Sequence, residues 1–277
     1  MACSQCFQGT VKAGTARGSE IDYHGYKAYV VTPSANASTR RAVQVIISDA
    51  FGWATPNIRL LADSYADRTG MRVYVPDFMD GTAAPQWLMK HTDRIQSEGG
   101  WYGWLVKPWL VLNAGLAFAP FFYRNSPPSR YSRVTGFLEQ LRNNSDAGIK
   151  VGVVGFCWGG YHVTRLAHGE VGADGRALID AGFSAHPSAL TIPKDIEGIT
   201  LPYSVAVGDE DFALGPKLIQ QLQDVLKSKK DVDSEVVVLR GAKHGFAVRA
   251  DPADEAAMQA SRDAEDQMAQ WFERFLV

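Results

Sequence analysis

The chain has 277 residues, of which 46% are hydrophobic and 21% are charged, and its formal net charge is −2. These values are typical of a globular protein with a sizeable core, and we expect one domain over residues 1–277. There is no basic surplus to hold phosphate backbones, so nucleic acid is not expected as a partner.

The predicted elements alternate along the chain, and each apolar β-type run is continuous rather than half-polar. This pattern is typical of an α/β protein with a mainly parallel central sheet and helices on both faces. Strands are predicted at residues 27–31, 42–47, 72–75, 150–154, 177–181, 203–207 and 235–239, and helices at residues 57–68, 129–142, 161–168, 216–227 and 253–275.

Residues 85–128 interrupt this alternation with several tryptophans and prolines and the pair Phe121-Phe122. We expect an insertion that forms a lid over the active site, with aromatic side chains lining an apolar pocket. Alternatively, these aromatic side chains only pack the insertion onto the body of the protein.

The N-terminal residues, the cysteine count and the apolar runs of the chain bear on where in the cell the protein is expected. The first ten residues lack the basic and apolar regions of a secretory signal, and three cysteines are too few for a disulfide framework. We expect a cytoplasmic protein in which Cys3 and Cys6, despite their redox or metal-clip spacing, lie in a terminal tail. The apolar run at residues 109–122 is shorter than the roughly 18 residues of a membrane span, so no membrane is expected as a partner.

Cys157 lies in the segment V-G-V-V-G-F-C-W-G-G at residues 151–160, between a strand-like run and a helix-like one. Gly155, Gly159 and Gly160 supply the small neighbours that a sharply bent backbone requires. This is the pattern of a nucleophile elbow with cysteine in the place of serine. We expect the thiol to stand above the sheet as a nucleophile, and the alternative is a buried core thiol.

An acid and a histidine follow in the chain order nucleophile, acid, histidine. Asp211 comes after the predicted strand 203–207, and His244 comes after the strand 235–239. Ligands of open α/β sheets gather at the carboxyl edge where such loops meet, so we expect both side chains to converge on Cys157. Asp209 and Glu210 are alternatives to Asp211 in the same loop.

Four motifs together resemble the dienelactone hydrolase family, from about residue 43 to the C-terminus. The resemblance implies the α/β-hydrolase fold, in which the backbone N–H groups of Trp158 and Ala50 form the oxyanion hole. Residues 81–128 match the family much less well. The motifs are G-F-C-W-G-G, the G-x-x-D of residues 208–211, H-G-F-A-V-R from His244, and S-D-A-F-G at residues 48–52.

The family resemblance extends to side chains that bind or activate. A family glutamate that helps to activate the cysteine corresponds here to the shorter Asp49, which could instead only cap its loop. A family arginine that binds a substrate carboxylate resembles Arg249 and suggests an anionic substrate. The alternative for Arg249 is a surface ion pair with Asp251. His186 follows a predicted strand end and is a candidate for substrate contact.

These residues predict a cysteine-dependent hydrolase of small esters or lactones that works through a thioester acyl-enzyme. His244 would hold the thiol proton while Asp211 fixes the imidazole tautomer. The alternatives are a non-hydrolytic member of the same fold that binds or isomerises a metabolite, and a redox-active thiol protein. No histidine pair has the spacing of a zinc site, so no metal or cofactor is expected, and the chain could be a monomer or a homodimer.

Overall fold

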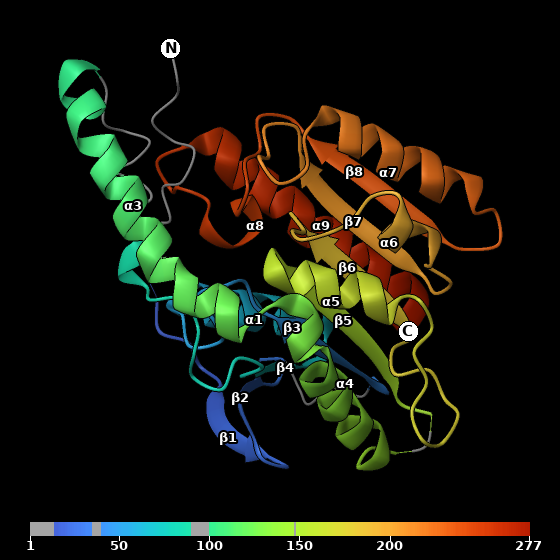
Figure 1. Cartoon of the computed structure of the whole chain (residues 1–277). Helices are drawn as coiled ribbons and strands as arrows, with labels where there is room; N and C mark the ends of the chain where they lie inside the picture. The colour runs from blue at the N-terminus through green and yellow to red at the C-terminus, as the bar shows by residue number, and fades with distance from the viewer. Residues whose placement is uncertain (1–13, 35–39, 90–99, 147) are drawn as a thin grey trace.

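A computed structural model describes residues 14–34, 40–89, 100–146 and 148–277, which build one central sheet (Figure 1). Its eight strands lie in the order β1-β2-β4-β3-β5-β6-β7-β8. The pairs β1·β2 and β2·β4 are antiparallel and the others are parallel, as predicted for a mainly parallel sheet. The strands are β1 Ser19–Tyr23, β2 Tyr26–Val31, β3 Ala42–Ile47, β4 Arg72–Pro76, β5 Lys150–Phe156, β6 Ala181–Ala185, β7 Tyr203–Gly208 and β8 Ser234–Leu239.

Helices cover both faces of the sheet. Residues of α4 to α7 share a core cluster on one face, and residues of α1, α8 and α9 share a second cluster on the other face. The helices among the described residues are α1 Pro56–Thr69, α3 Gly100–Arg124, α4 Pro127–Asn143, α5 Trp158–Leu166, α6 Lys194–Glu197, α7 Pro216–Ser228, α8 Phe246–Arg249 and α9 Glu255–Leu276.

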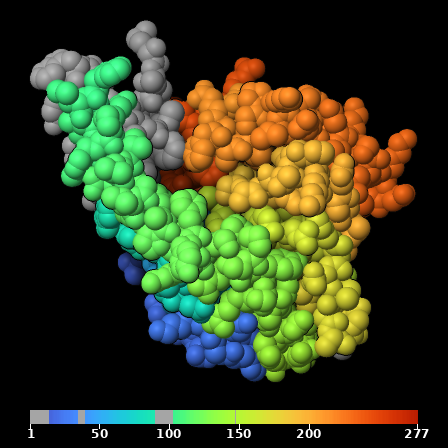
Figure 2. All heavy atoms as spheres, viewed as in Figure 1, coloured from blue at the N-terminus to red at the C-terminus, as the bar shows by residue number. Residues whose placement is uncertain are grey.

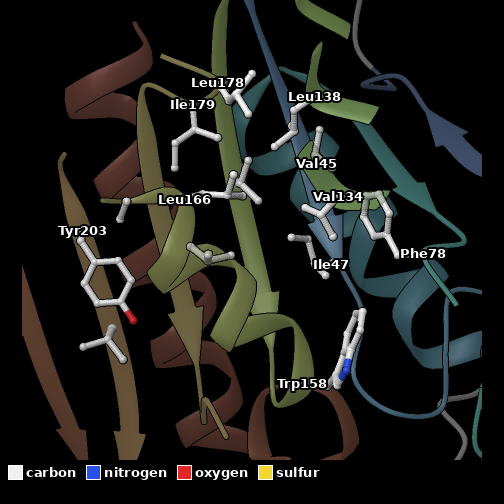
Figure 3. Packing of buried hydrophobic residues seen from close by; sticks show 14 of the residues in the cluster. Val45, Ile47, Phe78, Val134, Leu138, Trp158, Leu166, Leu178, Ile179 and Tyr203 are labelled. Atoms are coloured by element: carbon white, nitrogen blue, oxygen red, sulfur yellow. The ribbon is translucent and has the colours of Figure 1, made fainter. Parts of the chain in front are cut away.

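The central strands supply both cores, because successive side chains of a strand point to opposite faces. In β3, Val45 and Ile47 belong to the cluster that includes α4 and α5, whereas Ile46 packs in the cluster of α1 and α9. Figure 3 shows the first cluster, in which Leu138 of α4 and Leu166 of α5 pack beside β3 and β5. The sheet is therefore apolar on both faces, and its loops are left to carry polar chemistry.

Two strands differ from the sequence-based expectation. The strand predicted at residues 177–181 lies instead at Ala181–Ala185, where four of the five residues are small. The more apolar run just before it led to the earlier placement. Strand β1 was not predicted, because its residues S-E-I-D-Y are mostly polar and exposed at the sheet edge. The other predicted strands and the predicted helices are confirmed, with ends that differ by a few residues.

The insertion predicted at residues 85–128 contains the long helix α3, which projects beyond the body in Figure 1. Helix α3 continues through Lys107 and Pro108, so it is longer than the apolar run expected at residues 109–122. Its segment Gly103–Arg124 is long and apolar enough to cross a membrane by length and composition, and 17% of its most apolar window is buried.

The two ends of this insertion are tied together at the body of the protein. The Asn125 side-chain amide donates to the Thr82 backbone carbonyl at 2.9 Å. The Trp158 indole N–H, at the start of α5, donates to the Asn125 backbone carbonyl at 2.7 Å. The C-terminal end of α3 is therefore fixed beside the turn that carries Cys157.

Candidate active site

Cys157 occupies a one-residue turn between β5, which ends at Phe156, and α5, which begins at Trp158. Its backbone has φ 50° and ψ −110°, a strained conformation for any residue with a Cβ. The turn is close-packed, because a Cβ on Gly155 would meet the Gly159 backbone, and one on Gly159 would meet the Ile47 carbonyl. The predicted sharp turn is thus present, and it directs a half-buried thiol into a cavity.

His244 and Asp211 meet at the carboxyl edge of the sheet, as their loops after β8 and β7 predict. The His244 Nδ1 atom lies 2.9 Å from each carboxylate oxygen of Asp211, and both residues are buried. The two alternative acids of this loop are engaged elsewhere: Asp209 accepts from the Gly241 amide, and Glu210 is 3.9 Å from the Lys243 amine. Of the three acids, Asp211 is therefore the one that is hydrogen-bonded to the imidazole.

Cys157 and His244 shift each other's protonation. Burial raises the pKa of the Cys157 thiol, but the charge of His244 and its hydrogen bond lower it, and the net pKa lies below the ordinary value. Burial lowers the pKa of His244, while Cys157 and Asp211 raise it, and the net pKa lies above the ordinary value. Both directions favour a thiolate beside an imidazolium, which titrate together as a pair.

Ser188 is a neighbour of the sulfur that the sequence analysis did not identify. Its hydroxyl lies 3.5 Å from the Cys157 Sγ atom, and this hydrogen bond lowers the pKa of the thiol. Ser188 is in the A-H-P-S turn after β6, two residues beyond His186, the residue that the sequence predicted for substrate contact. The position of this turn at the same sheet edge is the signal that could have identified the serine.

A cavity of about 610 Å³ opens at Cys157. Both residues expected to supply oxyanion donors, Ala50 and Trp158, line it beside the thiol. The wall opposite is mostly aromatic and aliphatic, and three of its phenylalanines belong to α3, as expected for aromatic residues of the insertion. The larger apolar side chains of this lining include Phe51, Met89, Phe118, Phe121, Phe122, Leu190 and Phe212.

Asp49 and Arg249 also line the cavity, where they form an ion pair with each other. Asp49 is buried and accepts from the Phe51 amide at 3.0 Å, and the Arg249 guanidinium lies over the Phe51 ring at 5.0 Å from its centroid. The alternative of a surface ion pair with Asp251 is therefore replaced by a pair inside the site. The negative charge of Asp49 raises the pKa of Cys157.

His186 is buried beneath the site and does not line the cavity. Its ring centroid is 5.1 Å from that of His244 and 5.3 Å from that of Phe246, and burial holds its pKa well below the ordinary value. The expected substrate contact is not supported, because the turn after β6 brings Ser188 to the cavity and leaves His186 behind the imidazole.

No cluster of three metal-ligating side chains is present in the part of the chain that the structure describes. Cys3 and Cys6 lie outside the described residues. What the site offers is a thiol, an imidazole that is hydrogen-bonded to a buried carboxylate, and a largely apolar cavity that is also lined by one ion pair.

A model of the dienelactone hydrolase family matches residues 26–276. Among similar proteins, hydrolase pyvD of Aspergillus violaceofuscus is 27% identical over 271 residues, which cover 98% of this chain and 96% of that protein. A carboxymethylenebutenolidase homolog of Mus musculus is 25% identical over 265 residues, which cover 94% of this chain and 91% of that protein.

Solved structures resemble the fold over nearly the whole chain. A dienelactone hydrolase from Anabaena variabilis has a TM-score of 0.58 at 16% identity and covers 94% of this chain and 98% of that one. A dienelactone hydrolase-like promiscuous phosphotriesterase from metagenomic libraries has a TM-score of 0.59 at 20% identity, with coverage of 95% and 99%. These similarities confirm the predicted α/β-hydrolase fold.

Proposed function

The chain belongs to the dienelactone hydrolase family, and from this membership we propose that it is a cysteine hydrolase of small esters or lactones. The observation that supports this proposal is the position of Cys157, at a strained turn, beside a histidine that is hydrogen-bonded to Asp211. A nucleophile, a base and an orienting acid within hydrogen-bond reach are the requirements of covalent acyl transfer.

In the first half of the reaction, the Cys157 thiolate attacks the carbonyl carbon of the ester and forms a C–S bond. The backbone N–H groups of Trp158 and Ala50 donate to the oxyanion, and each such donor contributes roughly a hundredfold or more to the rate. The intermediate collapses by breaking the C–O bond, and the imidazolium of His244 protonates the leaving oxygen. For a lactone, this oxygen stays tethered to the acyl group.

In the second half, the neutral His244 takes a proton from water, and the resulting hydroxide attacks the thioester carbon. The C–S bond breaks, the acid product leaves, and the thiolate and imidazolium are restored. Asp211 keeps the Nδ1 proton in place throughout, so that the other ring nitrogen always faces the sulfur and the reacting oxygen. The turn strain at Cys157 holds the sulfur in position for both attacks.

The cavity favours an acyl or alcohol group with an apolar body, because its walls are largely phenylalanine. Arg249 can also hold an anionic group on the substrate. A guanidinium has five N–H donors, and the ion pair with Asp49 leaves others for a ligand. A small, partly apolar ester or lactone, with or without a carboxylate, is the substrate class proposed.

A panel of aryl esters, thioesters and lactones, assayed with wild type and Cys157→Ala, tests the proposal. Turnover of at least one substrate class should fall by roughly 10⁴-fold or more in the variant. Mass spectrometry of the wild type, quenched during turnover of an activated ester, should show the acyl mass on the peptide that contains Cys157. Full activity in Cys157→Ala would reject the proposal.

A redox-active thiol protein is a second candidate, favoured by the lowered pKa of Cys157. Here the sulfur would reduce a peroxide to water or an alcohol and become a sulfenic acid, which an external thiol would reduce again. Rapid trapping of sulfenic acid by a dimedone probe, together with no turnover across the ester panel, would favour this function over hydrolysis.

A further inference from the structure

Helix α3 presents an apolar face to the surface of the molecule. The exposed fraction is 86% for Trp104 and 64% for Leu116, values unusual for large apolar side chains. Figure 2 shows α3 as a ridge along one side of the body. We call this face the α3 ridge and define it by the exposed residues Trp104, Leu105, Val111, Leu112 and Leu116.

The ridge is not the face by which α3 is attached. Gly103, Leu110, Ala114 and Phe121 are buried and recur at helical spacing on one side of α3. The exposed apolar residues occupy the other side. Ala114 and Phe121 on this buried side join the core cluster of the body, and the ridge residues are not part of either core cluster of the described residues.

Charge and composition identify what would cover the ridge. Helix α3 contains Lys107 and Arg124 but no aspartate or glutamate, although the whole chain has a net charge of −2. Apolar side chains, exposed tryptophans and cationic flanks are the combination by which helices settle in the headgroup region of anionic membranes. A protein partner of ordinary surface composition would not require a helix free of acidic residues.

We propose that the α3 ridge docks on an anionic phospholipid surface, with α3 lying in the plane of the interface. The helix does not cross the bilayer, because its other side stays packed on the body. This proposal departs from the sequence-based expectation of no membrane partner, which rested on the short apolar run at residues 109–122.

Docking in this orientation places the cavity at the lipid surface. Phe122 is 64% exposed on α3 and also lines the cavity at Cys157, and Phe118 and Phe121 continue that wall. Phenylalanines of α3 therefore lead from the exposed surface of the helix to the cavity at Cys157. Apolar esters that are dissolved in a membrane could enter the cavity without passing through water.

Vesicle co-sedimentation with the full chain tests the proposal and does not depend on turnover. We expect the protein to sediment with vesicles of phosphatidylcholine and phosphatidylserine, more weakly with phosphatidylcholine alone, and more weakly in high salt. The test pair is Val111→Asp, at 54% exposure on the ridge, and Val171→Asp, at 56% exposure elsewhere. The first should lower the partition coefficient by about tenfold, because it loses apolar burial and repels anionic lipid, and the second should not change it.

Both substitutions are at exposed positions, so circular dichroism should show that each variant folds, and a Leu112→Asp variant repeats the ridge test one residue along. Equal binding by Val111→Asp and Val171→Asp would overturn the proposal, as would no sedimentation of wild type with either vesicle. A wild-type dimer in analytical ultracentrifugation that Val111→Asp dissociates, without vesicle binding, would assign the ridge to a second copy of the chain and also overturn it.

Discussion

The carboxyl edge of the sheet and helix α3 both contribute to one cavity, yet their side chains are held in opposite ways. At the sheet edge, Asp211 and His244 are buried and their polar atoms are paired with each other. On α3, the apolar side chains of Trp104 and Leu116 are exposed. The proposed chemistry thus lies among buried, paired side chains, while the cavity beside it is walled in part by a helix that is packed on one side and exposed on the other.

Removal of the base should produce the larger change at the sheet edge. In His244→Ala, burial and the charge of Asp49 still raise the pKa of Cys157, whereas the lowering by His244 is lost. Alkylation by iodoacetamide at pH 7 should slow by roughly tenfold or more, since an ordinary thiol is only a few per cent ionised there. In wild type the thiolate should persist as the pH falls, and in the variant it should disappear at higher pH.

His24→Ala, at an exposed histidine of the β1–β2 turn, is the matched control and should alkylate like wild type. An unchanged profile in His244→Ala would show that the imidazole does not ionise the sulfur.

A change in the α3 wall should affect binding rather than chemistry. Phe118 lines the cavity, and its ring lies 6.1 Å from Phe51 and 5.8 Å from Phe122. In Phe118→Ala, KM for an apolar aryl ester should rise by about tenfold, because apolar contact area is lost, and kcat should change little. An acetate ester too small to reach this wall is the control substrate. A fall in kcat with unchanged KM would place Phe118 in the chemistry instead.

The smallest expected effect concerns the buried ion pair. Asp49 raises the pKa of Cys157, so Asp49→Asn should lower the apparent pKa of the thiol and speed alkylation at pH 6 by a factor of about two to five. Asp231→Asn, at an exposed position, is the control. Slower alkylation in Asp49→Asn would mean that Asp49 activates the sulfur, as the family glutamate does, and would reverse the sign argued here.

The sequence predicted the parts of the site that local patterns encode. The glycines around Cys157 indicated a sharp turn, because the backbone segments there pass too close to one another for larger side chains. Asp211 and His244 could be placed because loops after parallel strands share one edge. For these elements, short-range spacing and the topology of the sheet are sufficient.

Other features depend on packing between distant segments and could not be predicted from the sequence. Asp49 and Arg249 are separated by 200 residues, so only the folded chain shows that they pair. Strand β6 has Gly182 where α5 packs closely over it, because a Cβ there would meet the Val163 side chain. Helix α3 was missed because Pro108 and Pro120 disfavour a continuous helix.

The hydrogen bonds that join Thr82, Asn125 and Trp158 fix both ends of the insertion to the body of the protein. The acceptors of both hydrogen bonds are backbone carbonyls, which any replacement sequence would also present. The intervening residues that do not pack in the core could therefore be exchanged for others while the sulfur stays where it is. Such a replacement would change which molecules reach the thiol. The residues proposed for hydrolysis would stay in place.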